Sequence, residues 1–157
     1  MGLKLFRRKQ HTEATRPPDM GAVSERYNEY FPRLFAYART CVGGEMPAQD
    51  IVIQAFNRAF GHPDSADEDR FRTVLFRTAR RLCRPALKQA RVDDGDSLNR
   101  REREALSLVF DAGLTRDQIA RLFRIRETTV SALLMSGLRK LKEQTSPAAA
   151  AAYLKLA

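Results

Sequence analysis

The chain has 157 residues, of which 43% are hydrophobic and 30% charged, and this composition is typical of a folded globular protein rather than a disordered, fibrous or membrane-embedded one. Its 28 Lys and Arg residues exceed its 19 Asp and Glu residues, and the net charge of +9 favours a polyanionic partner, above all nucleic acid. Cys41 and Cys83 are far apart without metal-ligand spacing, and no apolar run approaches the roughly 18 residues that span a bilayer. We therefore expect a cytoplasmic protein with no metal, cofactor, small-molecule substrate or membrane insertion.

Two helices are predicted after an N-terminal arm. Residues 1–19 are basic and polar, and we expect them to be disordered. Helical periodicity from Ser24 predicts a helix that ends at Gly43–Gly44, with a kink or restart at Pro32. A second helix is predicted from Pro47 to Gly61. Their predicted core faces are Tyr27, Tyr30, Phe31, Leu34, Ala38 and Cys41 in the first helix, and Ala48, Ile51, Val52, Ala55, Phe56, Ala59 and Phe60 in the second.

A third predicted helix carries a large excess of positive charge. A capping box at Ser65 is expected to open it, and the segment from Arg70 to Arg91 contains eight basic residues and no acidic one. On a helical wheel six of these basic residues share one face and the apolar residues lie on the other, which indicates a basic ridge on a core-packed helix. A merely solvated face is the competing interpretation. Pro85 is expected to kink this helix or end it early. The basic ridge comprises Arg77, Arg80, Arg81, Arg84, Lys88 and Arg91.

A second helical unit is predicted after a short acidic linker at residues 93–97. Capping boxes at Asn99 and Thr115 open its first two helices, and a turn at residues 123–125 precedes a third. This order of helices is typical of a helix-turn-helix unit. We expect Val130, Leu134, Gly137 and Leu141 of the last helix to face inward. The predicted fold class is thus all-α, with two small helical domains at residues 20–92 and 98–144 and an alanine-rich tail at 145–157.

The segment from Ala22 to Glu143 resembles the extracytoplasmic-function (ECF) sigma factors, a family of two-region transcription initiation factors. Residues 31–38, 48–56 and 71–91 follow the family's region 2 in order, and residues 100–143 follow its region 4, especially at 114–120. The region 4 pattern alone is shared with the output domains of LuxR-type regulators. The two patterns together, in this order, favour the sigma factor.

The resemblance implies three partners and no catalytic residue. Asp50, Ile51 and Gln54 are expected to bind core RNA polymerase, which carries out the chemistry. The basic ridge is expected to hold promoter DNA, the last helix is expected to read the upstream promoter element, and an anti-sigma factor is the third expected partner. The implied DNA-binding residues of the last helix are Arg126, Thr128, Thr129, Ser131, Ala132, Arg139 and Lys140.

Two departures from the family support an alternative. Ser131, Leu133 and Ser136 stand where relatives commonly carry Lys or Arg, and the linker, counted from Val92 to Ser97, spans at most about 20 Å. Promoter elements of this family lie more than one DNA turn of about 34 Å apart. The alternative is a sigma-like protein that binds an anti-sigma factor or another regulator instead of a promoter. A LuxR-type regulator is a third interpretation, but it leaves the basic ridge unexplained.

Overall fold

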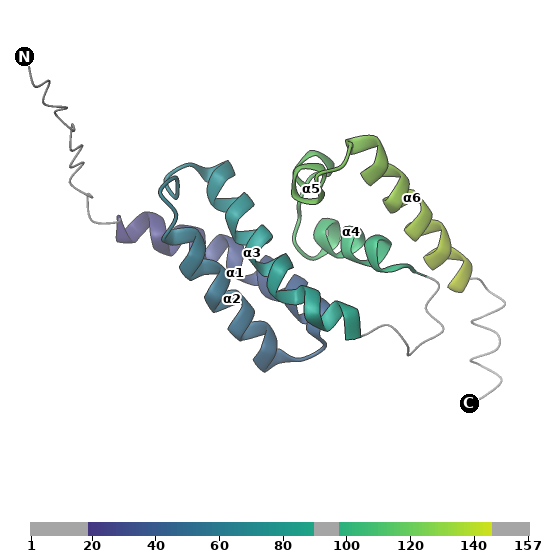
Figure 1. Cartoon of the computed structure of the whole chain (residues 1–157), viewed down its shortest axis with the longest axis horizontal. Helices are drawn as coiled ribbons and strands as arrows, with labels where there is room; N and C mark the ends of the chain where they lie inside the picture. Colours follow the sequence, from purple (N-terminus) through teal and green to yellow (C-terminus); the bar gives the residue numbers. More distant parts are fainter. Residues whose placement is uncertain (1–18, 90–97, 146–157) are drawn as a thin grey trace, which may run out of the picture.

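The computed structural model describes residues 19–89 and 98–145, and within them it contains six α-helices and no strand (Figure 1). The helices are α1 (Met20–Val42), α2 (Glu45–Phe60), α3 (Glu68–Gln89), α4 (Arg100–Phe110), α5 (Arg116–Phe123) and α6 (Glu127–Gln144). The predicted all-α class with two helical units is confirmed. The predicted arm, linker and tail lie outside the described residues, apart from Asp19 and Thr145, and the domain limits stay predictions.

Helices α1, α2 and α3 form the first unit around an aromatic core. The ring of Tyr30 lies 5.8 Å from that of Phe71 and 6.3 Å from that of Phe76, and all three side chains are almost completely buried. Tyr27, predicted to be in the core, is instead 41% exposed, because it lies at the margin of the unit with one face against the ring of Phe56, 4.9 Å away.

The glycine predicted to end the first helix does so, whereas the capping box predicted at Ser65 is wrong. α1 ends at Gly43, whose φ of 71° is left-handed and suits glycine. α3 begins two residues later than a Ser65 cap requires: Asp67 Oδ1 accepts a hydrogen bond from the Arg70 backbone N–H at 2.8 Å, while the Ser65 N–H belongs to a preceding turn.

Neither internal proline ends its helix. α1 continues through Pro32, and α3 continues through Pro85 to Gln89, so the expected early end of α3 is wrong. A proline frees the carbonyl four residues before it, here that of Asn28 or Arg81. Both prolines and both of these residues are exposed, so water can bond the freed carbonyls.

Helices α4, α5 and α6 form the second unit. Both predicted capping boxes are present: Asn99 with Glu102, and Thr115 with Gln118. Arg124 ends α5 in a left-handed conformation with φ 57° and turns the chain into α6. Leu141 is 36% exposed rather than in the core, because it lies near the end of α6 where it lines a shallow surface groove with Leu106.

The two units pack directly against each other. The two units lie side by side (Figure 1), where α1 contacts α4 and α3 contacts α5. Buried apolar residues of both units belong to one continuous core. The second unit contributes Leu108, Ala112, Leu114, Ile119, Ala120, Leu122 and Val130 to that core. The described residues therefore adopt a closed arrangement, in which part of the first unit's surface is covered by the second.

Candidate nucleic-acid interface

The outer face of α2 carries two of the three residues expected to bind polymerase. Asp50 and Gln54 are exposed one turn apart, with Ile53 between them 57% exposed. Ile51 is only 7% exposed and belongs to the core, so its side chain is not available to a partner and its expected role is corrected. The exposed Ile53 is the apolar residue of this face that the sequence interpretation missed.

Four members of the basic ridge are exposed along α3: Arg77, Arg81, Arg84 and Lys88. They succeed each other at intervals of four, three and four residues, which places them on one helical face. Arg80 is only 25% exposed and turns toward the second unit, and Arg91 lies outside the described residues. The ridge interpretation thus holds for the described part of α3, with Arg80 as the exception.

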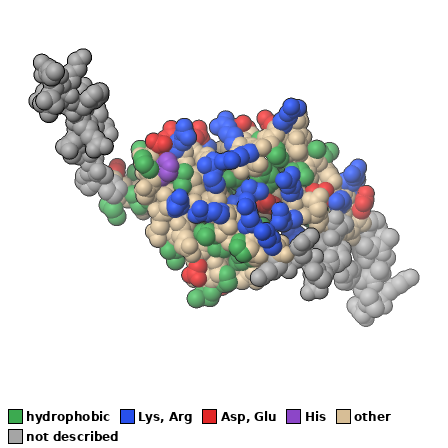
Figure 2. Space-filling model, in the orientation of Figure 1, with side chains coloured by type: hydrophobic (Ala, Val, Ile, Leu, Met, Phe, Trp, Pro, Cys, Tyr) green, Lys and Arg blue, Asp and Glu red, His purple; other side chains and the backbone are tan. Residues whose placement is uncertain are grey.

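The ridge forms one wall of a groove between the two units. The groove encloses about 570 Å³, and the second unit adds three cations that the sequence interpretation did not include: Arg100, Arg101 and Arg124. Figure 2 shows Lys and Arg side chains gathering across the middle of this face of the molecule. We call this feature the basic groove. Its lining residues are Arg77, Arg80, Arg81, Arg84, Leu87, Lys88, Arg100, Arg101, Glu104, Leu122, Phe123 and Arg124.

Glu104 of α4 is the buried anion that joins the units. Its side chain is 4% exposed, and Oε1 accepts hydrogen bonds from Arg80 Nε at 2.7 Å and from the Tyr37 hydroxyl at 3.1 Å. Burial raises the pKa of Tyr37 well above its ordinary value, so the hydroxyl stays protonated and donates. The Arg80 guanidinium also lies over the ring of Phe123, 4.4 Å from its centre.

Further polar bonds support the same contact at its edge. Arg33 Nε donates to the Ala112 carbonyl at 2.6 Å and Arg33 Nη2 to the Gly113 carbonyl at 3.3 Å. The Thr40 hydroxyl is bonded to Asp111 Oδ2 at 3.2 Å. The two Arg33 bonds go to carbonyls of the turn that follows α4, and the Thr40 bond goes to a carboxylate at the end of that helix, so α1 holds the turn after α4 in place.

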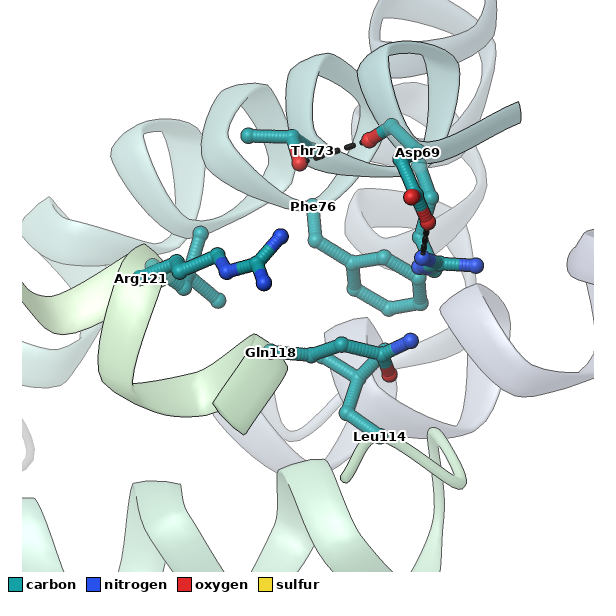
Figure 3. A pocket seen from close by; sticks show the side chains of 8 residues that line it. Asp69, Thr73, Phe76, Leu114, Gln118 and Arg121 are labelled. Carbon is teal, nitrogen blue, oxygen red and sulfur yellow. Dashed lines mark hydrogen bonds and ion pairs between the residues drawn. The ribbon is translucent and has the colours of Figure 1, made fainter. Parts of the chain in front are cut away.

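A cavity of about 20 Å³ lies where α3 meets α5, with room for about one water molecule. In Figure 3 the side chains of Gln118 and Arg121 face Phe76 across it. The small size of this cavity shows that the two units are closely fitted here.

The last helix, α6, presents few cations at its expected DNA-binding positions. Arg126, Thr128, Thr129, Ala132 and Arg139 are exposed. Ser131 is half-buried and hydrogen-bonded to Arg116 Nη1 at 3.3 Å. Met135, in the middle of the outward face, is 69% exposed.

Lys140 is engaged within the protein, and its expected role in DNA binding stays a prediction. Its Nζ lies 2.8 Å from Glu102 Oε2 and 3.0 Å from Oε1, and Ser136 Oγ donates to the same carboxylate at 2.7 Å. Burial acts to raise the pKa of Glu102, but the bonds from Lys140, the Asn99 backbone N–H and Ser136 lower it to about 2. The pair therefore fastens α6 to α4.

The part of the chain that the structure describes contains no group of three His, Cys, Asp or Glu side chains able to hold a metal ion. None of its helices is long and apolar enough to cross a bilayer.

Comparison with protein-family models gives two matches in sequence order. The Sigma-70 region 2 model matches residues 26–92, and the Sigma-70 region 4 model matches residues 96–143. The first match covers α1 from Arg26 onward and all of α2 and α3, and the second covers α4 to α6 except Gln144. No curated protein matches the chain.

Proposed function

The chain belongs to the sigma-70 family, and from this premise we propose that it is an ECF-type sigma factor of the cytoplasm that binds core RNA polymerase and directs it to promoters. The observation that carries the proposal is that regions 2 and 4 occur in order, with an exposed α2 face and an exposed basic ridge on the same unit. The polymerase supplies the chemistry of RNA synthesis, and we assign no catalytic residue to this chain.

We assign polymerase binding to the α2 face around Asp50 and Gln54. The two side chains are exposed on consecutive turns, and Ile53 adds an apolar contact between them. An apolar side chain ringed by polar groups is the composition expected of an interface centre. Ile51 supports this face from the core rather than touching the partner.

The experiment for this assignment is a binding measurement between the full chain and core RNA polymerase. We expect the double variant Asp50→Ala/Gln54→Ala to bind about tenfold or more weakly, because the loss of one energetically central residue costs about 2 kcal/mol or more and a tenfold change corresponds to about 1.4 kcal/mol. The matched control is Glu25→Ala/Asn28→Ala, which removes one exposed acid and one exposed amide from α1. Equal affinity of the two double variants would contradict the assignment.

We assign promoter contacts to Arg77, Arg81, Arg84 and Lys88, whose exposed charges can track DNA phosphates. The closed arrangement turns this ridge toward the second unit, and promoter elements more than about 34 Å apart require the units to separate. We therefore propose that polymerase binding opens the molecule. The assignment is tested by measuring the affinity for a promoter fragment in the presence of polymerase at several salt concentrations, because phosphate contacts make that affinity fall as salt rises.

One observation favours the alternative of a sigma-like protein that binds an anti-sigma factor or another regulator. The outward face of α6 presents Ala132 and Met135, and Lys140 is held by Glu102. A small apolar face with an exposed Met suits a protein partner as well as DNA. Polymerase binding without promoter-dependent transcripts would favour this alternative, whereas sequence-specific promoter binding would exclude it.

A further inference from the structure

We propose that the basic groove is a binding site for a compact anion carrying two or more adjacent phosphates, such as the polyphosphate group of a nucleotide. The proposal concerns the closed protein without polymerase or promoter. It goes beyond the proposed function and does not depend on it.

The first support is the charge of the walls. Five of the eight lining cations come from α3, and three come from the second unit. Within the described residues that line the groove, Glu104 is the one carboxylate. Its Oε1 accepts hydrogen bonds from Arg80 and Tyr37, so this carboxylate is the ion-pair partner of Arg80. The other lining cations are Arg77, Arg81, Arg84, Lys88, Arg100, Arg101 and Arg124.

The second support is the shape of the groove. Its volume of about 570 Å³ lies in the range of small-molecule sites, about 300–1,000 Å³. The continuous core beneath it holds the two units together, so a DNA duplex cannot enter between them. Leu87 and Phe123 are half-buried and add an apolar part to the wall, although Arg80 covers one face of the Phe123 ring.

The third support is that both units contribute cations to the groove. In the closed arrangement, positive charges of α3 face positive charges of α4 and of the turn after α5, and like charges that converge in a concave site repel. An anion with several charges contacts both walls and replaces this repulsion by attraction. Binding should therefore stabilise the closed arrangement and oppose its opening.

Inorganic tripolyphosphate is a direct probe, titrated into the full chain by calorimetry at about 0.15 M salt, where long-range charge effects are screened. The test variant Arg84→Gln/Arg101→Gln removes one exposed cation from each wall. The control Arg58→Gln/Arg70→Gln makes the same change in net charge at exposed positions outside the groove. Circular dichroism establishes that all proteins are folded.

We expect tripolyphosphate to bind at one site per chain, to raise the thermal midpoint, and to bind about tenfold or more weakly to the groove variant, because charge-assisted bonds to phosphate are lost from both walls. The control variant should bind within about twofold of the parent, since screening leaves little effect of distant charge. Sulfate at equal ionic strength should not compete.

Three results would overturn the proposal. The first is the absence of saturable tripolyphosphate binding. The second is an equal loss of affinity in the groove and control variants, which would indicate net charge alone. The third is tight binding of single-stranded DNA that tripolyphosphate does not displace, which would make the groove a nucleic-acid site instead. None of these measurements uses polymerase, so a failure here leaves the proposed function untouched.

Discussion

Replacing Glu104 by Gln should shift the protein from its closed toward an open arrangement without unfolding either unit. The substitution keeps the shape of the side chain and removes the charge that pairs with Arg80 Nε at 2.7 Å across the contact between the units. Hydrogen bonds to charged groups contribute about 1.5–3 kcal/mol, and breaking a fully buried ion pair costs more. Because Arg80 is 25% exposed and water can reach it, we expect about 2 kcal/mol, or an approximately 30-fold shift in the ratio of closed to open molecules.

The assay is small-angle X-ray scattering of the full chain, combined with a distance measurement between labels on Asn57→Cys and Ala132→Cys, two exposed positions on different units. We expect a larger radius of gyration and a longer label distance for Glu104→Gln. The control Glu127→Gln removes an exposed acid whose partner, Arg116, lies in the same unit, and it should leave both values unchanged. Identical scattering and label distances for Glu104→Gln and the parent would refute the reasoning.

Three further predictions concern buried groups. Replacing Lys140 by Met should lower the free energy of unfolding by about 1–3 kcal/mol in a urea titration, because Glu102 is left buried without its charged partner, whereas Lys142→Met at an exposed position should change it by less than about 0.5 kcal/mol. The pKa of Glu102 is lowered from 4.5 to about 2, so its contribution to stability is complete above about pH 4.5 and is lost as the pH falls toward 2. The thermal midpoint of Lys140→Met should therefore decline less over that pH window than the midpoint of the parent. A hydrogen bond with Cys41 and burial raise the pKa of Cys83, so mass spectrometry should find iodoacetamide labelling of Cys83 slow in the native protein and fast in denaturant; fast native labelling would contradict the buried placement.

Local signals predicted the helices well. The capping boxes at Asn99 and Thr115 depend on residues three positions apart, so sequence spacing is sufficient to find them. The internal prolines were harder to interpret, because whether a helix survives a proline depends on the exposure of the carbonyl that it frees.

The contacts between residues distant in the sequence are the part of the site that the sequence did not predict. Arg80 and Glu104 are 24 positions apart, and nothing in either segment specifies that the two units pack against each other. The part of α3 from Arg70 onward contains no acid, which could have suggested that an acid from elsewhere meets it, and Glu104 is such an acid. The ion pair of Lys140 could not be predicted for the same reason, since its partner Glu102 lies on another helix.

Ile51 shows a different limit of sequence reasoning. Resemblance to a family indicates which segment binds the partner, but it does not indicate which residues of that helix face outward. The structure places Ile51 in the core and Ile53 on the outer face, so the apolar contact assigned to a partner moves by two residues. Asp50 and Gln54 keep their assignment because both are exposed.

The proposal that this chain directs transcription initiation is tested by run-off transcription of genomic DNA with core RNA polymerase and the full chain. We expect discrete new start sites that appear with the parent protein and weaken with Asp50→Ala/Gln54→Ala. Stable polymerase binding without any new start site, or no binding at all, would contradict it and favour a sigma-like protein that acts on a regulator.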